Sequence, residues 1–595
     1  MKELWYVSCS PRNPAKIRDE VALLAKLEGE DWNAKDSSGK HTTQIKFAQM
    51  LAKSTGFEGT AAGKESDFSA RDRVAPMKTY GFAYIDEDNR IRITKAGKEL
   101  IKGVNEERVF LMQLLKWQYP SAQHGESEYL DEPATLFEPK KLGFNLLPFI
   151  FTLQVAKKVD GLTKREIAFF LLPHHRLSGI SKVVEEIKRY RTAREGKKGR
   201  VAKKTFDEKM HQKLYKKIYA KHLAKYSNKT ERAKQLKKKM ANSRDVADAC
   251  MRLFRYTGIF GTQKDRLVLN DTRAEEIAVI LSRKWKIVEF YKNSKLFYSY
   301  FGDPEKPELP FFEKSFLIRK ITSLAKRIEK EKAGLPVEFS LDDVTTSALE
   351  KMSKAELLSK ITELILLFRT LSKRQLESYL KSARGQRDVL DFYDAIINHD
   401  VADPPSFFEW NTWRALIALD EAKEVIPNMK LDDRLWPIDC ARGNCPDMVV
   451  KFANYVVAVE VTMTGGRRQY MTEPEPVTFH VGRCKKEEED SGSKRRVYGL
   501  FIAPTINKHA ANHFLQHIRQ LEVPDYGNVT VVPIDLNMWK SILSFANSLG
   551  YLRDHALGEL LAAVESAGTS TKSVDAWLGS IPELVEIWKA QLSVA

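Results

Sequence analysis

Two acidic residues flank a predicted β-hairpin and could together bind a divalent cation. Residues 448–452 and 455–462 are rich in Val and aromatic residues, which favour strands. They are joined across Ala453 and Asn454, and Asn tolerates the left-handed backbone of a tight turn. A turn that is symmetric about these two residues places Asp447 opposite Glu460.

Facing residues of an antiparallel pair have Cβ atoms about 4.5–5.5 Å apart. Two carboxylates at that separation repel each other, and the apolar residues around them remove their hydration. A divalent cation offsets both effects, and hard oxygen ligands suit Mg²⁺. We therefore expect Asp447 and Glu460 to bind Mg²⁺ as the cofactor of a hydrolytic site.

The order P-D, hairpin, E-x-T resembles the core motif of the PD-(D/E)xK metal-dependent nucleases. Thr462 stands two residues beyond Glu460, on the same face of the strand, where that pattern usually carries Lys. The alternative is a hairpin whose acidic residues point toward water, because short motifs of this kind arise often by chance.

The elements predicted around the hairpin follow the order of a restriction-endonuclease-like α/β core. An amphipathic helix at 407–421 carries Glu409 in its first turn, where the helix dipole favours a carboxylate. After the hairpin, the pattern predicts further helices and strands. They are a helix at 469–488, a strand at 497–504, a helix at 508–520 and a strand at 529–534.

Two more candidate residues follow the hairpin. Glu473 could orient a water molecule or bind the metal ion, and His480 could act as an acid or base near neutral pH. Outside this topology, both would be interpreted as ordinary surface residues. A competing set of Cys440, Cys445, His480 and Cys484 resembles a zinc site, but its first spacing is too wide for a typical one.

The chain as a whole is basic, with 97 Lys and Arg against 79 Asp and Glu in 595 residues, a net charge of +18. This balance indicates a polyanionic partner, although RNA or a membrane surface would explain the charge as well as DNA. Five scattered cysteines do not make a disulfide framework, so a reducing compartment is expected. The N-terminus lacks the apolar core of a signal peptide and no apolar run is long enough to span a bilayer, so we expect a soluble intracellular protein.

The first half of the chain repeats one plan twice. Residues 69–101 and 242–280 each predict a helix, a hairpin and a second helix, which is the winged-helix arrangement. Both contain an R-D dipeptide and an aromatic residue on either side of a glycine. Thr94 is expected to cap the second helix of the first copy. We interpret the pair as DNA-binding units, and the alternative is a purely structural role.

Six basic residues of these units are candidates to face DNA, because Arg can reach O6 and N7 of guanine together. They are Arg71, Arg73, Lys78, Arg244, Arg252 and Arg255. The alternative for each is a helix cap or an ion pair with a neighbour such as Asp72 or Asp245. The stretch 181–244 carries a one-signed excess of Lys and Arg and is expected to contact phosphates without reading bases.

Several longer strings resemble the AlwI/BstNBI-type restriction and nicking endonucleases, a family with PleI- and MlyI-like members. The strings are W-Y-V-S-C-S-P-R at 5–12, D-R-V-A-P-M-K-T-Y-G-F at 72–82, K-W-Q-Y-P at 116–120, R-D-V-A-D-A at 244–249, F-R-Y-T-G at 254–258, G-N-C-P-D-M at 443–448 and E-P-V-T-F-H at 475–480. They span nearly the whole chain, apart from a helical spacer and the last few dozen residues.

The resemblance implies an α/β multidomain protein with a mostly helical N-terminal half. It implies a DNA-recognition domain at 1–285, made of two winged-helix-like subdomains at about 1–150 and 151–285. A helical linker at 286–395 and a PD-(D/E)xK cleavage domain at 396–595 would follow.

It also implies a type IIS or nicking endonuclease that binds a short asymmetric site, GAGTC- or GGATC-like, and hydrolyses one strand a few bases outside it. The family's catalytic cluster corresponds to Glu409, Asp447, Glu460, Glu473 and His480. Thr462, in place of Lys, leaves open which group activates the water. The implied partners are double-stranded DNA, a cognate methyltransferase and either a small nuclease subunit or a transient homodimer, in the bacterial cytoplasm and away from membranes.

Three other functions stay open from the residues alone. A double-strand-cutting type IIS enzyme would need a second chain, either another copy or a small subunit. A DNA-binding regulator would use its C-terminal domain only to assemble partners and would not cut. A repair or recombination nuclease would read DNA structure rather than a short sequence.

Overall fold

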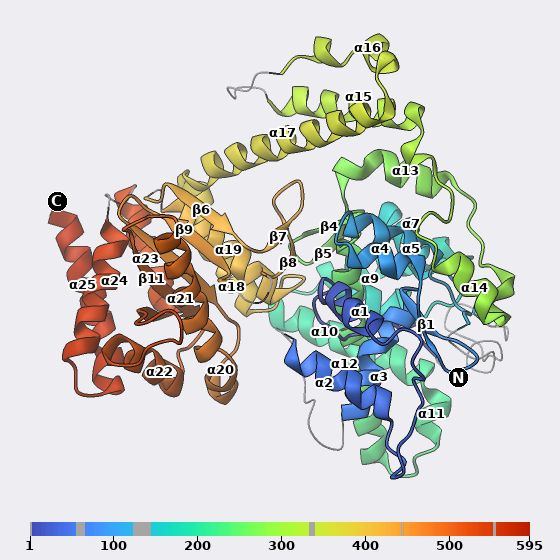
Figure 1. Ribbon diagram of the computed structural model, residues 1–595, viewed down its shortest axis with the longest axis horizontal. Helices are drawn as coiled ribbons and strands as arrows, with labels where there is room; N and C mark the ends of the chain where they lie inside the picture. Colours follow the sequence, from blue (N-terminus) through green and yellow to red (C-terminus); the bar gives the residue numbers. More distant parts are fainter. Residues whose placement is uncertain are drawn as a thin grey trace. The chain divides into compact units, whose positions relative to one another are not determined.

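The computed structural model describes residues 3–54, 66–122, 144–332, 339–419, 421–441, 443, 445–550, 552 and 555–594. The chain forms two compact units (Figure 1). The first comprises Met1–Lys330 and Glu338–Leu364, and the second comprises Glu331–Val337 and Ile365–Ala595. The helices expected of a separate linker are divided between these units, and the long helix α17, Lys354–Leu380, belongs to both. The division into three domains remains a prediction.

The first unit is mainly helical, with two small antiparallel sheets. Its elements up to the basic helices are α1 Lys16–Ala25, α2 Thr42–Lys53, α3 Ser66–Thr79, β1 Ala83–Ile85, β2 Ile91–Ile93, α4 Lys95–Ile101, α5 Glu106–Lys116, α7 Pro148–Val159, β3 Leu162–Thr163 and α8 Lys164–Glu166. The remaining elements are α9 Ile180–Glu195, α10 Arg200–Ile218, α11 Ala220–Ala224, α12 Lys229–Arg255, β4 Phe260–Gln263, β5 Arg266–Leu269, α13 Ala274–Ser282, α14 Ser294–Phe301, α15 Lys314–Glu331 and α16 Thr346–Lys351.

Both predicted helix–hairpin–helix segments are present in this unit. The first runs α3, β1, β2, α4, and the second runs α12, β4, β5, α13. Asn89 and Lys264 take positive φ at the two hairpin turns. The Thr94 hydroxyl accepts a hydrogen bond from the backbone N–H of Gly97, which confirms the predicted cap of α4. Strand β3 extends the second sheet, and the winged-helix assignment itself remains a prediction.

The second unit is built on one five-stranded mixed sheet in the order β12-β11-β10-β9-β6. Strands β10, β11 and β12 are parallel, whereas β9 and β6 run antiparallel to their neighbours. Its strands are β6 Glu424–Pro427, β7 Lys430–Leu431, β8 Pro437–Asp439, β9 Met448–Lys451, β10 Tyr455–Val461, β11 Arg496–Ala503 and β12 Val531–Asp535. Its helices are α18 Ala383–Ile397, α19 Pro404–Ala418, α20 Gly466–Thr472, α21 Pro474–Asp490, α22 Lys508–Arg519, α23 Leu536–Leu549, α24 Ala556–Ser570 and α25 Val574–Val594.

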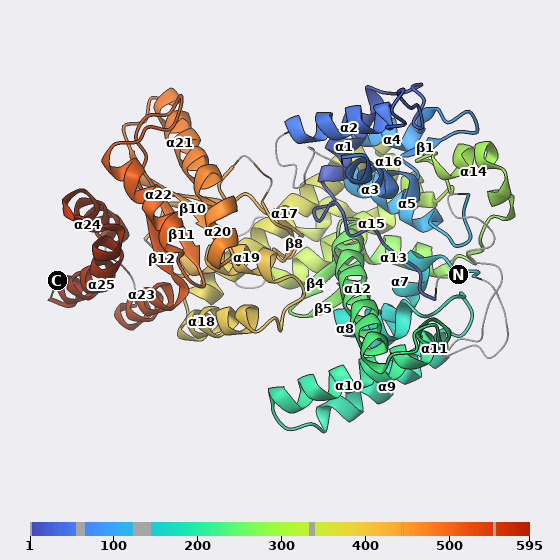
Figure 2. The ribbon, with the colours of Figure 1, turned by 90° about the horizontal axis from the view of Figure 1, so that it is seen from below.

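Helices cover the sheet and bury its Val-rich strands. Helices α21 and α22 pack on strands β10 to β12, and α19 and α23 also contact the sheet (Figure 2). Every residue of β10 except the last is buried, because covering on both faces requires an almost continuous apolar run. This packing explains why the strand reads Y-V-V-A-V-E-V, with one charged residue, Glu460, near its end.

The hairpin register agrees with the prediction. Val450 pairs with Val457, and Met448 pairs with Val459. The prediction missed β6, which is short and ends in Pro427, a residue tolerated at a sheet edge. Across the described ranges, no helix combines the length and apolar character needed to cross a lipid bilayer. All five cysteines are free, as expected.

Gly499 of β11 lies beneath Val481 of α21. A Cβ at Gly499 would stand 2.6 Å from Val481 Cγ2 and 3.0 Å from Val531 Cγ2. We expect Gly499→Ala to lower the free energy of unfolding of this unit by about 1–3 kcal/mol, because overpacking displaces α21. At Gly579 of α25, nothing lies within 4 Å of an added Cβ, so Gly579→Ala should raise that free energy by about 0.5–1 kcal/mol. Urea unfolding measures both, and effects of the same sign would contradict this account.

Candidate active site

The β9–β10 hairpin brings the two predicted metal ligands to one end of the sheet. Asp447 immediately precedes β9, and Glu460 is the penultimate residue of β10. Asp447 Oδ2 accepts a hydrogen bond of 2.7 Å from the backbone N–H of Val461, which ties the two strands together beyond their last ladder pair. Glu460 is buried, and Asp447 is partly exposed.

Burial raises the pKa of both carboxyl groups well above the usual range, and neighbouring carboxylates raise it further. Glu460 and Glu473 act on Asp447, while Glu409 and Glu473 act on Glu460. These groups therefore repel one another where water screens them poorly. A bound cation would relieve this repulsion, and the ionised carboxylates supply the hard oxygen donors that it requires.

Glu409 approaches the pair from α19. Its Oε2 accepts a hydrogen bond of 2.8 Å from the backbone N–H of Ala441, and burial and then the charge of Asp447 raise its pKa well above the usual range. The prediction that Glu409 occupies the first helical turn is wrong. The helix begins at Pro404, with Pro at its first position, so Glu409 is the sixth residue and buried. Contact with Ala441, rather than the helix dipole, holds this carboxylate.

His480 reaches the same cluster from α21. Its Nδ1 lies 2.6 Å from Glu460 Oε1. Burial, and to a lesser degree the charge of Arg483, lowers the pKa of His480 to about 4. The imidazole is therefore neutral at pH 7, and toward an ionised Glu460 carboxylate its Nδ1 carries the proton, which leaves Nε2 as an acceptor. The expected titration near neutral pH is shifted to acidic pH in this site.

Glu473 is held by the hydroxyl groups of three threonines. Its Oε1 accepts hydrogen bonds from the hydroxyls of Thr462 at 3.2 Å, Thr464 at 2.7 Å and Thr472 at 3.1 Å. Thr462, at the position where the PD-(D/E)xK pattern has Lys, thus joins a hydroxyl network. Sequence reasoning missed Thr464 and Thr472, although the T-x-T pattern at 462–464 directly after the acidic strand was a usable signal.

The competing zinc set is not assembled. Cys440 contacts the hydroxyl of Ser406, His480 pairs with Glu460, and Cys484 is buried in α21. Within the part of the chain that the structure describes, no group of three or more His, Cys, Asp or Glu side chains is gathered around one metal position. Asp447 and Glu460 suit Mg²⁺ better, because this ion often binds through one or two carboxylates and keeps several waters.

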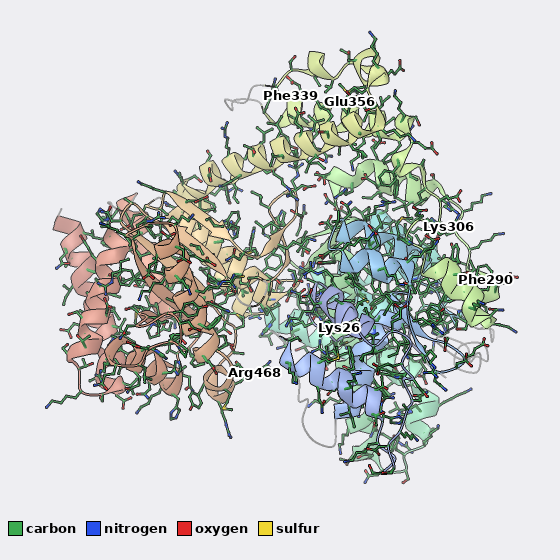
Figure 3. The ribbon with its side chains drawn as sticks, in the orientation of Figure 1. Lys26, Phe290, Lys306, Phe339, Glu356 and Arg468 are labelled. Carbon is green, nitrogen blue, oxygen red and sulfur yellow. The ribbon has the colours of Figure 1, made fainter. Side chains whose placement is uncertain are left out.

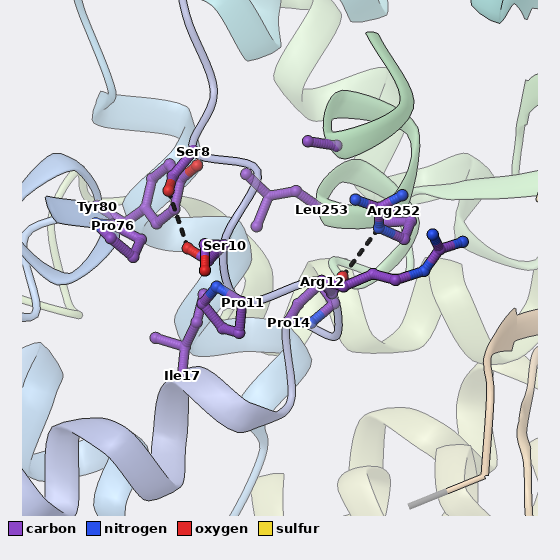
Figure 4. A pocket seen from close by; sticks show the side chains of 11 residues that line it. Ser8, Ser10, Pro11, Arg12, Pro14, Ile17, Pro76, Tyr80, Arg252 and Leu253 are labelled. Carbon is purple, nitrogen blue, oxygen red and sulfur yellow. Dashed lines mark hydrogen bonds between the residues drawn. The ribbon is translucent and has the colours of Figure 1, made fainter. Parts of the chain in front are cut away.

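Three of the residues predicted to face DNA are buried in this structure, and their contact with DNA remains a prediction. Arg73 pairs with Glu20 at 2.6 Å, with both side chains at 8% exposure. Arg252 pairs with Asp248 and donates to the backbone carbonyl of Arg12 at 2.8 Å, beside a small pocket (Figure 4). Arg255 is 1% exposed and donates a hydrogen bond to the neighbouring strand β4. The guanidinium group of an Arg in a helix packs inward when other elements place hydrogen-bond acceptors beside it. The sequence of the helix does not reveal those acceptors.

The other three candidates lie nearer the surface of the first unit. Arg244 is about half exposed and pairs with Glu208. Arg71 is exposed and donates to the Gln44 side chain at 3.2 Å. Lys78 is partly buried, and that burial lowers its pKa. Their role toward DNA remains a prediction.

The carboxylate repulsion predicts how the metal-free protein responds to pH. Because the folded pKa of Asp447 is above its unfolded value, its contribution to stability decreases as pH rises above about 4. With a chelator present, we expect Asp447→Asn to raise the thermal midpoint more at pH 8 than at pH 5, and Asn can still accept from Val461. The control Glu583→Gln, on the exposed side of α25, should change the midpoint little and equally at both pH values. An equal gain from Asp447→Asn at the two pH values would refute the repulsion.

Comparisons with known proteins identify the family of this chain. The model of the AlwI restriction endonuclease family matches residues 78–542, which is more than half of the chain. No curated protein matches. Similar solved structures include the small subunit of the heterodimeric restriction endonuclease R.BspD6I, with 25% identity over 35% of this chain and 99% of that one and a TM-score of 0.28. Another is the BpuJ1 endonuclease binding domain in complex with modified DNA, with 16% identity over 48% of this chain and 90% of that one and a TM-score of 0.30. On the family match, the chain belongs to the AlwI restriction endonuclease family and is a DNA endonuclease.

Proposed function

We propose that this endonuclease is a Mg²⁺-dependent enzyme of the type IIS or nicking kind. It would bind a short asymmetric site, GAGTC- or GGATC-like, and hydrolyse one phosphodiester a few bases outside that site. The observation that carries the proposal is the hairpin that sets Asp447 beside Glu460, with Glu409 and His480 converging on the same pair. A DNA-binding regulator would gain nothing from such mutually repelling groups.

The residues of the site would have different roles in hydrolysis. Asp447 and Glu460 would hold Mg²⁺, which when bound acts as a Lewis acid and lowers the pKa of water. His480 fixes the orientation of Glu460 through Nδ1–H, and its neutral Nε2 can accept a proton from the attacking water. Glu473 and its threonine hydroxyls can orient that water, and Glu409 supports the cluster from α19.

The site departs from the PD-(D/E)xK pattern in one respect. Thr462 has no ammonium group, so it cannot stabilise the charge that develops on the phosphate as Lys would. The hydroxyl of Thr462 is instead bonded to Glu473. We therefore assign proton removal to His480 and Glu473 and keep the PD-(D/E)xK core as the proposed fold of the second unit.

The first unit supplies the surface for DNA recognition in this proposal, through its two winged-helix-like segments. Arg71, Lys78 and Arg244 remain candidates there. Helices α10 to α12 add phosphate contacts, since they share a small core of Tyr215, Tyr219, Leu236 and Met240 and turn many lysines to solvent. The exposed lysines include Lys204, Lys209, Lys213, Lys216, Lys217, Lys221, Lys225, Lys237 and Lys238.

The described residues of one chain form one such carboxylate cluster, so one chain should cut one strand. A double-strand break would need a second cluster, from a transient homodimer or from a small nuclease subunit. As in other restriction systems, a cognate methyltransferase would protect the host's own sites.

Removing the proposed metal ligand Asp447 should abolish DNA cleavage without weakening DNA binding. We expect Asp447→Ala to lower the cleavage rate of a plasmid by about 10³-fold or more, because metal binding is lost. Affinity for the recognition site should stay unchanged, because the first unit is intact. Asp490→Ala, an exposed residue at the end of α21, is the matched control and should cut at the wild-type rate. Equal cutting by both variants would contradict the assignment of the site.

The order of products reports how many strands one chain cuts. With supercoiled plasmid and dilute purified protein, we expect nicked circles first and linear DNA only slowly, because the described part of each chain holds one cluster. Sequencing the nicked strand by run-off then gives the offset from the site. Linear product formed as fast as nicked circles at high dilution would exclude single-strand action, and cutting only at branched DNA would favour a repair nuclease.

A further inference from the structure

Helix α20, Gly466–Thr472, follows the acidic strand β10 after a turn of four residues. Its inner side is fixed by Gln469, which is fully buried. The Gln469 amide donates to the carbonyls of Thr464 at 2.9 Å and Thr505 at 3.0 Å, and its oxygen accepts from the Asn507 N–H at 2.6 Å. All of its side-chain hydrogen-bonding groups are thus used to hold this short helix against neighbouring backbone.

The same helix is tied to the catalytic cluster at its far end. Glu473 follows its last residue, and the Glu473 carboxylate accepts from Thr462 and Thr464 before the helix and from Thr472 within it. Gly466 takes φ of +57°, a conformation that most side chains avoid, where the backbone turns into the helix. The helix therefore has a set position relative to Glu473 and the end of β10.

The outer side of α20 has an unusual composition for a free surface. Arg467 and Arg468 are exposed, and next to them Tyr470 is 44% and Met471 64% exposed. Figure 3 shows Arg468 extending from α20 into solvent. Among the described residues neither arginine forms an ion pair, whereas Arg483 on the adjacent α21 pairs with Glu487 at 3.0 Å.

We propose that α20 holds the DNA strand that is cut, with Arg467 and Arg468 contacting phosphates on either side of the scissile bond. Arginine forks match phosphate oxygens, and exposed aromatic and thioether groups suit the sugar faces between them. The proposal rests on the proposed function. It also supplies positive charge close to a cluster in which Thr462 replaces Lys, through side chains that position the strand.

A double cycle of protein and DNA changes tests this contact. The substrates are duplexes with one recognition site and a single neutral methylphosphonate at each position near the cut. The proteins are wild type, Arg467→Ala, Arg468→Ala and the control Lys494→Ala. Lys494 is exposed just before β11, at the opposite end of the parallel strands from Glu460. Single-turnover cleavage and equilibrium binding are measured for every pair, and thermal melting checks that each variant is folded.

On unmodified DNA, each arginine variant should cut about 10–100-fold more slowly than wild type, because the strand is misplaced. Affinity for the recognition site should be unchanged, and Lys494→Ala should match wild type. On the duplex whose contacted phosphate is neutral, the arginine variant should show no further loss. Wild-type rates for both arginine variants, or an equal loss on every modified duplex, would overturn the proposal. Failure of the proposed function is distinct, because wild type itself would then bind without cutting any duplex.

Discussion

Mutual repulsion among carboxylates in a poorly hydrated site is the constraint on which the second unit depends. The pKa values of Asp447, Glu460 and Glu409 are all raised, first because their carboxyl groups are poorly hydrated and then because other carboxylates lie near them. A fold maintains such an arrangement only when the backbone around it is rigid and a bound ligand offsets the free-energy cost of the carboxylate repulsion. In the proposed function that ligand is a cation, and the family match makes this chain a DNA endonuclease.

The rigidity comes from the sheet and the short contacts at its edge. Covering on both faces buries β10 almost completely, and the two-residue turn at Ala453 and Asn454 fixes its register against β9. The Val461 N–H then fixes the carboxylate of Asp447, and Ala441 fixes that of Glu409. His480 and Glu473 complete the site through hydrogen bonds to side chains of β10 or residues just beyond it. Backbone N–H groups thus orient Asp447 and Glu409, whereas an imidazole and threonine hydroxyls orient Glu460 and Glu473.

The positive charge of the chain is used in two different ways. Some arginines, including Arg73 and Arg255, are internal and pack within the first unit. The lysines of α10 to α12 and the arginines of α20 are at the surface, where they can displace counterions from phosphates. The net charge therefore indicated a polyanionic partner, but it did not indicate which basic residues contact that partner.

The amino-acid sequence by itself determined the local features. The hairpin register follows from a two-residue turn between Val-rich strands, and the cap of α4 follows from Thr94 ahead of a helical run, because both depend on near neighbours in the chain. Tertiary structure decided the rest. The pairing of His480 with Glu460, the burial of Glu409 and the inward packing of Arg252 depend on partners supplied by other elements. Periodicity shows that a side chain faces inward or outward, but only the folded chain determines which group it meets there and whether its charge is screened, paired or repelled.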